Sequence, residues 1–464
     1  MTGSSPSDAH PSPDSTHDAE SENRILIRNG CIVPMTGAAH RRADLLIKGD
    51  RIARIEENID EPGAMVIDAD DFIVLPGFID THRHLWQSSL RHVACDWSLT
   101  EYFTTLRSKF GPRFTAEDIY AGTLVGALEA LDAGVTTVVD FAHNLSAPDH
   151  ADAALAAHIE AGSRALLAYG GTNEQARVRD NSRHTRDAER LRASVPAEHV
   201  DRLTIGLALR GPEFSSMDAT IDDWHLAREL GMTITVHVGG GLRGAQGTIH
   251  KLDAESLLGD DVLYVHCNML SDDELRRIAD TGGRASTSPE VEANMGHGPT
   301  VVSRLRNHGI PAGISVDVCT NVGGDLFSPM RAALALQRGD DHVKALLRGE
   351  ALGTVSIGVR DVLEMTTVDA AKAAWQDDRT GTLEPGKLAD IVLLRTDRLN
   401  VLPGRDPVAA TVSACDVSNV DTVFVGGRIV KRDGLLVGVD LDQIRRLASE
   451  SRDRLHGVTE VVTA

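Results

Sequence analysis

The chain has 464 residues, of which 42% are hydrophobic and 25% are charged, a composition typical of a globular protein. Its net charge of −21 argues against a nucleic-acid partner, and the lack of any apolar run of 18 or more residues argues against a membrane-spanning helix. Five widely spaced cysteines fit neither a disulfide framework nor a C-x-x-C zinc site, so we expect a reducing, cytoplasmic location.

Both ends of the chain predict β-structure. Residues 1–23 are polar and acidic, without the pattern of a signal peptide, and are expected to be a disordered tail. Short apolar runs separated by turn residues then follow, as in "RILIRNGCIVPM". The same pattern occurs near the C-terminus in "VDTVFVGGRIVKRDG". Because each half alone would leave unpaired strand edges, residues 24–70 and 383–440 are predicted to form one small β-sandwich. Residues 441–464 are predicted to be a C-terminal helix and tail.

The middle of the chain, residues 71–382, alternates β-branched runs with amphipathic helical stretches. The strand candidates are "FIVLPGFID", "GVTTVVDFA", "RALLAYGG", "LTIGLALRG", "MTITVHVGG", "VLYVHC", "RASTSP" and "IPAGISVDV". Eight strands alternating with helices predict an α/β fold, the (β/α)8 TIM barrel. Enzymes with this fold place their chemistry at the carboxyl ends of the strands.

Histidine and aspartate stand at four of these strand ends. His82 and His84 follow the first strand, and residues i and i+2 of an extended backbone point to the same side. His237 ends the fifth strand, His266 the sixth and Asp317 the eighth. Imidazoles with a carboxylate suit Zn²⁺ or Fe²⁺, and a water on such an ion is acidic enough to act as a nucleophile near pH 7.

The segments "PGFIDTHRHLWQSSLR", "GVTTVVDFAHN", "VHCNMLSDDEL", "GISVDVCTN" and "GTLEPGKLADIVLL" resemble the amidohydrolase superfamily, in the branch of cytosine, guanine and adenosine-type deaminases and triazine chlorohydrolases. The resemblance covers nearly the whole chain after Asn23. It implies a (β/α)8 barrel with a β-sandwich made from both chain ends.

The resemblance also implies roles for the residues at the strand ends. His82, His84, His237 and Asp317 would bind one divalent metal ion, with Zn²⁺ favoured and Fe²⁺ the alternative. Asp317 would also take a proton from the attacking water, and His266 would polarise the attacked centre and contact the substrate. No lysine ends the fourth strand, so a single ion is expected rather than a pair bridged by a carbamylated lysine.

The sequence departs from the family pattern at one place. Deaminases of this branch carry a proton-transferring glutamate three residues after the fifth-strand histidine, and here that position is Gly240. The candidates to replace it are Glu213, Glu290, Glu292 and His297. The run Gly239–Gly241 either removes side-chain bulk beside a ligand or forms a turn that needs positive φ angles.

Further substrate contacts are expected from the loop after the first strand and from the segment after the seventh. Aromatic residues make up only 4% of the chain, yet several of them lie in "HLWQSSLRHVACDWSLTEYF". Trp86 could stack on a planar ring, and Gln87 and Glu290 could form polar contacts.

The sequence therefore predicts a metal-dependent hydrolase of carbon–nitrogen bonds in a small, cyclic or heteroaromatic nitrogen compound, with deamination as the leading reaction. Because of Gly240, ring opening of a cyclic amide or imide and a metal-dependent lyase or isomerase reaction stay open as alternatives. A barrel that only binds its ligand is the rival outside catalysis. The expected partners are a small-molecule substrate and further copies of the chain in a homo-oligomer, with neither nucleic acid nor membrane.

Overall fold

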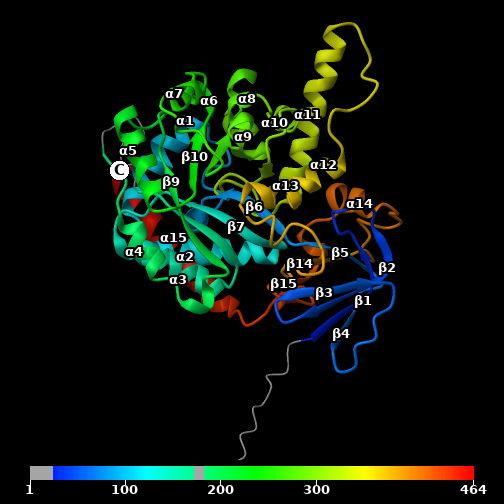
Figure 1. Ribbon diagram of the computed structural model, residues 1–464. Helices are drawn as coiled ribbons and strands as arrows, with labels where there is room; N and C mark the ends of the chain where they lie inside the picture. The colour runs from blue at the N-terminus through cyan, green and yellow to red at the C-terminus, as the bar shows by residue number, and fades with distance from the viewer. Residues whose placement is uncertain (1–23, 172–181, 464) are drawn as a thin grey trace, which may run out of the picture.

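The computed structural model describes residues 24–171 and 182–463, and shows a barrel beside a smaller sheet built from both ends of the chain (Figure 1). The tail predicted at residues 1–23 lies outside the described residues. Within them, no helix is long and apolar enough to cross a membrane.

The barrel consists of eight parallel strands, which confirms the predicted fold. The strands, each paired with the next, are β6 (Phe78–Arg83), β7 (Val135–Ala142), β8 (Arg164–Tyr169), β9 (Leu203–Leu209), β10 (Ile234–Val238), β11 (Val262–His266), β12 (Arg284–Thr287) and β13 (Ala312–Ile314). A parallel bridge between Arg83 and Asp317 joins the last part of the barrel to the first. The carboxyl ends of all eight strands therefore meet at one rim.

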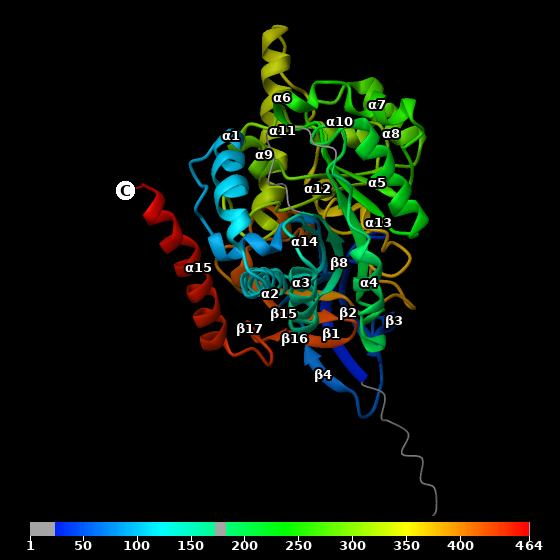
Figure 2. The ribbon, with the colours of Figure 1, turned by 90° about the vertical axis from the view of Figure 1, so that its left-hand side faces the viewer.

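Helices surround this barrel (Figure 2). They include α2 (Ala116–Asp132), α3 (Pro148–Ala161), α4 (Asp187–Ala193), α5 (Met217–Glu229), α7 (Thr248–Ala254), α8 (Asp272–Asp280), α10 (Val302–Asn307), α11 (Phe327–Leu347), α12 (Val359–Glu364) and α13 (Val368–Ala373). The last helix, α15 (Leu441–Thr463), packs against α2, where the Ser451 hydroxyl donates to Asp118 Oδ1 at 2.7 Å.

The first predicted barrel strand is split in two. Residues 72–76 form β5 (Phe72–Pro76), which pairs with the terminal sheet, and only β6 belongs to the barrel. The break is at Gly77, where an added Cβ would lie 2.3 Å from the Thr136 side chain. Close packing against β7 leaves no room for a side chain on residue 77, where the chain passes from the terminal sheet into the barrel.

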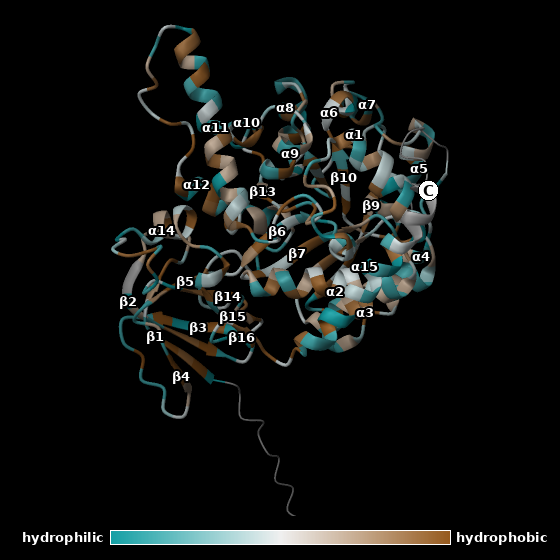
Figure 3. Ribbon diagram, turned by 180° about the vertical axis from the view of Figure 1, so that it is seen from behind, coloured by the Kyte–Doolittle hydropathy of each residue, from teal (hydrophilic) through white to brown (hydrophobic). Residues whose placement is uncertain are grey.

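The smaller unit is one nine-stranded sheet that combines both chain ends. Its strands are β1 (Arg24–Ile32), β2 (His40–Lys48), β3 (Arg51–Glu56), β4 (Met65–Asp68), β5, β14 (Ile391–Arg395), β15 (Val420–Val425), β16 (Arg428–Arg432) and β17 (Leu435–Leu436). The sheet curls until Arg51 bridges Leu388 and encloses an apolar core with Ile27 and Phe424. Figure 3 shows that β1 and β4 are mostly hydrophobic. The predicted pairing of the two ends is confirmed.

A buried ion pair connects the two units. Arg164 at the start of β8 contacts Asp390 just before β14, with Nε 3.0 Å from Oδ2 and Nη2 3.1 Å from Oδ1. Asp390 Oδ1 also accepts a hydrogen bond from the Gly426 amide at 2.7 Å. Both side chains are almost fully buried, so each charge depends on the other for its partner.

Candidate active site

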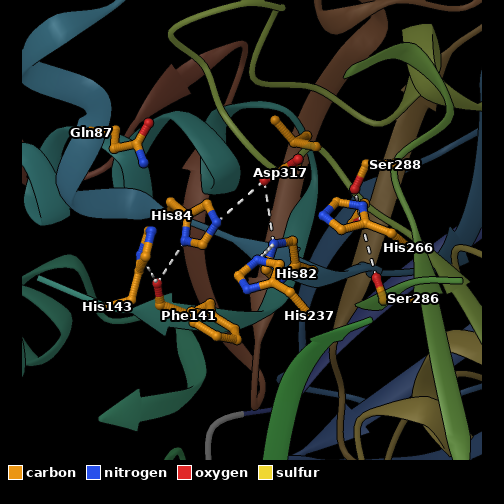
Figure 4. A network of polar contacts seen from close by, with 12 residues as sticks. His82, His84, Gln87, Phe141, His143, His237, His266, Ser286, Ser288 and Asp317 are labelled. Atoms are coloured by element: carbon orange, nitrogen blue, oxygen red, sulfur yellow. Dashed lines mark hydrogen bonds and ion pairs between the residues drawn. The ribbon is translucent and has the colours of Figure 1, made fainter. Parts of the chain in front are cut away.

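Three imidazoles and a carboxylate meet at the carboxyl rim of the barrel (Figure 4). His82 Nε2 lies 3.3 Å from His237 Nε2 and 3.3 Å from Asp317 Oδ1, and His84 Nε2 lies 3.4 Å from the same oxygen. Four ligands bound about 2.0–2.1 Å from a tetrahedral ion lie about 3.3–3.4 Å apart. The spacing of these donor atoms therefore fits one divalent metal ion.

Backbone contacts hold the ligand candidates in register. The amide of Asp317 donates to the His82 carbonyl at 3.0 Å, and the amide of His84 donates to the Asp317 carbonyl at 2.9 Å. His84 Nδ1 lies 2.8 Å from the Phe141 carbonyl, so it carries the proton and leaves Nε2 free for a metal ion. Asp317 has φ +64° and His266 φ +80°, a conformation that costs of the order of 1–3 kcal/mol and is concentrated at functional sites.

Burial keeps the imidazoles in the form that binds metals. The pKa values of His82, His84 and His237 lie well below their ordinary range, because burial disfavours the charged ring and neighbouring histidines oppose a second charge. A neutral imidazole offers the lone pair that a metal ion requires. The three rings are therefore ready to bind an ion near neutral pH.

His266 differs from these three histidines because a carboxylate lies behind it. Its Nδ1 is 3.1 Å from Glu292 Oε1, and Glu292 also accepts from the Ser288 amide at 2.7 Å and from the hydroxyl of Thr287 at 2.8 Å. Burial lowers the pKa of His266, but the hydrogen bond to Glu292 and the nearby charge of Asp317 outweigh it, and the pKa is raised. Glu292 is thus a buried support for His266 and is not free to replace the missing acid.

A cavity of about 430 Å³ lies over this cluster. Its lining includes four residues predicted from the strand ends, His84, His237, His266 and Asp317. Its other walls include Tyr102, Phe103, Arg107, Glu213, Phe214, Gly240, Arg243 and His297. The volume is in the range of small-molecule sites, about 300–1,000 Å³.

Three residues expected to contact substrate are not among those that line the cavity. Trp86 is buried and packs edge-on against Phe114, and its indole nitrogen lies 3.3 Å from His143 Nδ1. Gln87 is fully buried, stands apart from the histidine cluster in Figure 4, and donates to the Tyr102 hydroxyl at 2.6 Å. Glu290 is half-buried and is also outside the lining. The structure therefore places these side chains behind or beside the cavity.

The three glycines after His237 have two different roles. Gly239 and Gly241 have φ angles of +72° and +57°, so a turn explains them. Gly240 has φ −89°, which any residue adopts, and an added Cβ would lie 3.4 Å from His297 Cδ2 and 3.9 Å from His266 Cδ2. Backbone geometry does not require glycine at position 240, and its effect is to leave space beside His266.

Two of the groups that could replace the missing acid do reach the cavity. Glu213 is 5% exposed, and its Oε1 accepts from the Gly239 amide at 2.8 Å and the Thr248 hydroxyl at 2.7 Å. Burial raises the pKa of this carboxyl. His297 is also buried, its ring centroid is 4.5 Å from that of His266, and burial lowers its pKa to about 3.

The sequence reasoning missed two buried polar residues beside the ligand candidates. The ring of His143 packs on His84 with centroids 3.9 Å apart. Arg107 donates from Nη2 to the His143 carbonyl at 3.2 Å and lies over the Trp86 ring. Arg107 follows the aromatic segment that ends at Phe103, but a single charged residue gives no signal of burial in the sequence.

Comparison with known proteins agrees with this architecture. Residues 73–430 match the sequence profile of the amidohydrolase family. A 5-methylthioadenosine/S-adenosylhomocysteine deaminase of Symbiobacterium thermophilum is 30% identical over 453 residues, which cover 93% of this chain and 99% of that protein. A 5'-deoxyadenosine deaminase of Methanothermobacter thermautotrophicus is 27% identical over 430 residues, which cover 90% and 96%.

Solved structures share the fold at lower identity. An adenosine deaminase of Xanthomonas campestris with bound zinc has a TM-score of 0.79 at 21% identity, and the match covers 93% of this chain and 98% of that chain. Atrazine chlorohydrolase from Arthrobacter aurescens, complexed with zinc, has a TM-score of 0.78 at 21% identity and coverages of 92% and 100%. With the profile match over most of its length, the chain belongs to the amidohydrolase family.

Proposed function

We propose that the protein is a metal-dependent aminohydrolase. It replaces an amino group on a nitrogen heteroaromatic ring with oxygen from water and releases ammonia. The observation that carries this proposal is the cluster of His82, His84, His237 and Asp317, with three donor-atom distances of 3.3–3.4 Å, beneath a cavity of about 430 Å³. Full-length relatives named as deaminases of adenosine-type compounds support it.

His82, His84, His237 and Asp317 would hold the ion, for which we propose Zn²⁺. Nitrogen and oxygen donors in a tetrahedral arrangement suit zinc, and the adenosine deaminase of Xanthomonas campestris was solved with zinc. An ion held there would make a water molecule sufficiently acidic to act as a nucleophile near pH 7. Ferrous iron fits the same donor types, so metal analysis of the purified protein is the direct test.

The remaining chemistry belongs to side chains. The water oxygen bonds to the ring carbon that carries the amino group, and Asp317 accepts one proton from the water. His266, protonated and held by Glu292, stabilises negative charge at the attacked centre. The carbon–nitrogen bond then breaks, and the amino group leaves as ammonia with the proton that Asp317 held.

We propose Glu213 as the acid that acts in place of residue 240. Its raised pKa favours the protonated form, and it lines the cavity near His266. It would protonate the ring nitrogen as water adds, and it would recover a proton from the added oxygen when the carbonyl forms. Glu213→Gln should therefore lower kcat about 100-fold or more while metal content stays the same. Glu274→Gln is the matched control, because Glu274 is also buried and accepts hydrogen bonds, from the Ile249 and Ser271 amides, outside the cavity.

The deciding assay incubates metal-loaded protein with aminated heterocycles and cyclic amides and follows products by mass spectrometry. Replacement of an amino group by oxygen, with one ammonia per turnover, is the expected result. Gain of one water without ammonia would contradict deamination and would support ring opening, for which residue 240 need not be an acid.

The expected homo-oligomer and the cytoplasmic location stay predictions. Light scattering of the purified protein tests the first, and localisation of the tagged chain tests the second.

A further inference from the structure

Arg107 is a buried cation whose counter-charge is not found among the described side chains. Four arginine and lysine side chains are buried in the described part of the chain: Arg83, Arg107, Arg164 and Lys431. Arg83 contacts Glu129, Arg164 contacts Asp390 at 3.0 Å, and Lys431 contacts Asp132 at 2.8 Å. Arg107 forms no ion pair with a described carboxylate. Burying a charge without a partner is unfavourable, so its position calls for an anion from outside the chain.

The environment of Arg107 places it in the wall of the active-site cavity. The side chain is 3% exposed and lines the cavity. Its one hydrogen bond runs from Nη2 to the His143 carbonyl at 3.2 Å, while Nη1 has no partner in the described structure. A guanidinium carries five N–H donors, so most of its donors are unused. Burial lowers the pKa of Arg107 to about 10, which still leaves it charged at pH 7.

Tyr102 adds a second unused donor on the same wall. Tyr102 and Arg107 are five residues apart in a π-helical segment, Tyr102–Phe110, whose i→i+5 repeat puts them on one face. The Tyr102 hydroxyl accepts from Gln87 Nε2 at 2.6 Å, and the Gln87 carbonyl in turn accepts from the Thr320 hydroxyl at 3.4 Å. Gln87 thus uses the oxygen of Tyr102 as acceptor and leaves the phenolic proton for a ligand.

The two acids that line the cavity, Asp317 and Glu213, form no ion pair with Arg107 in the described structure. Asp317 lies against His82 and His84, and Glu213 is held by the Gly239 amide and the Thr248 hydroxyl. The second arginine of the same wall, Arg210, donates to Ser182 Oγ at 2.8 Å and lies 3.9 Å from Asp223, so it already has partners. Arg243, the third arginine of the lining, lies over the Phe214 ring, 4.8 Å from its centroid. Among the arginines that line the cavity, Arg107 is therefore the buried one for which the described structure offers no carboxylate partner.

We propose that Arg107 and Tyr102 form an oxyanion-binding subsite, and that the substrate carries an acidic oxygen group beside the ring that reacts. This inference rests on the proposed function for the reaction, and it adds the substrate class. The group is a carboxylate substituent or a ring-oxo group, because a guanidinium and a phenol donate to the charged oxygen of the first and to the partially negative oxygen of the second. Neutral amino heterocycles without such oxygen would be poor substrates.

The test compares three ligands built on one ring. Ammonia release by the zinc-loaded enzyme is measured with 4-aminopyrimidine, with cytosine and with 4-aminopyrimidine-5-carboxylate. The same comparison is then made with aminopurines that carry no oxygen group, a ring-oxo group or a carboxylate. We expect kcat/KM to be about 10- to 150-fold higher for the ring that carries the preferred oxygen, as one charged hydrogen-bonded contact provides. Preference for cytosine would identify a ring-oxo group, and preference for the carboxylate would identify that substituent.

Variants of Arg107 and Tyr102 test whether these side chains cause the preference for the oxygen-bearing ligand. Arg107→Met should remove the preference by raising KM for the preferred ligand, with a small effect on the oxygen-free ring, and Arg107→Lys should restore part of it. Tyr102→Phe should reduce the preference by a smaller factor. Arg210→Met is the matched control, because it removes an arginine from the same wall that already has partners, and it should keep the preference. Equal losses on all three ligands in Arg107→Met would indicate a structural role only and would overturn the proposal.

A binding measurement separates this inference from the proposed reaction. Calorimetry with pyrimidine-5-carboxylate and pyrimidine-5-carboxamide needs no turnover, and the acid should bind the wild-type holoenzyme at least about 10-fold more tightly than the amide, a difference that Arg107→Met should abolish. If no amino compound releases ammonia but this difference persists, the deaminase proposal fails and the subsite stands. An enzyme that binds the acid no more tightly than the amide, in the pyrimidine and purine series alike, and that shows no preference for cytosine over 4-aminopyrimidine overturns the subsite.

Discussion

Gly240 and Gly239 are adjacent, yet the structure predicts opposite responses to alanine. Gly240 has φ −89°, and its added Cβ would make an ordinary contact with His297 at 3.4 Å. Gly239 has φ +72°, and its added Cβ would lie 2.9 Å from the Cα atom of Cys267. Because that neighbour is backbone, it cannot move aside by rotating a side chain.

The expected magnitudes follow from these geometries. Gly240→Ala should raise the free energy of unfolding by about 0.4–1 kcal/mol, because alanine restricts the unfolded chain and fits the folded one. Gly239→Ala should lower it, by about 1–2 kcal/mol for the left-handed backbone and by about 1–3 kcal/mol more for overpacking. The two variants should therefore differ by at least about 2 kcal/mol.

Urea unfolding of the zinc-loaded proteins, followed by circular dichroism, measures this difference, and metal analysis shows that both variants start equally loaded. Gly239→Ala should unfold at distinctly lower urea than the wild type, and Gly240→Ala at the same or higher urea. A Gly240→Ala protein destabilised as much as Gly239→Ala would refute the conclusion that position 240 is free of backbone constraint.

Three further predictions concern the site and the join between the two units. Asp317→Asn should lower kcat about 100-fold or more without unfolding, because the backbone bonds of residue 317 to His82 and His84 remain; circular dichroism and initial rates check both parts. Removing the metal with a chelator should abolish activity and lower the melting temperature, and zinc at about 100 times its Kd should return about 2.7 kcal/mol of stability; an unchanged melting temperature would count against a bound ion. Arg164→Met should cost about 3–5 kcal/mol of unfolding free energy by leaving Asp390 buried without its partner, and the double variant with Asp390→Leu should recover most of it; a double variant no more stable than the single would contradict this account.

The sequence by itself determined the fold class and the place of the chemistry. The hydrophobic periods of strands and helices are local features of the sequence. The eight strand–helix alternations could therefore be predicted without knowledge of contacts between distant residues. A barrel of parallel strands gathers all carboxyl ends at one rim, which is why His82, His237, His266 and Asp317 could be expected together although 235 positions separate the first from the last. The structure brings the donor atoms of His237 and Asp317 each to 3.3 Å from His82 Nε2.

Tertiary structure alone decided which side chains face the cavity. Trp86 and Gln87 belong to the segment in which substrate contacts were expected. They lie in a 3-10 helix, Leu85–Leu90, and both side chains are buried outside the cavity lining. Glu292 could be a solvated loop residue by sequence, and it is buried against His266 instead. Arg107 becomes notable only when its surroundings are known, because only the folded structure shows whether a charged side chain has a partner. Orientation and burial depend on contacts between segments far apart in the chain, and no local pattern encodes those contacts.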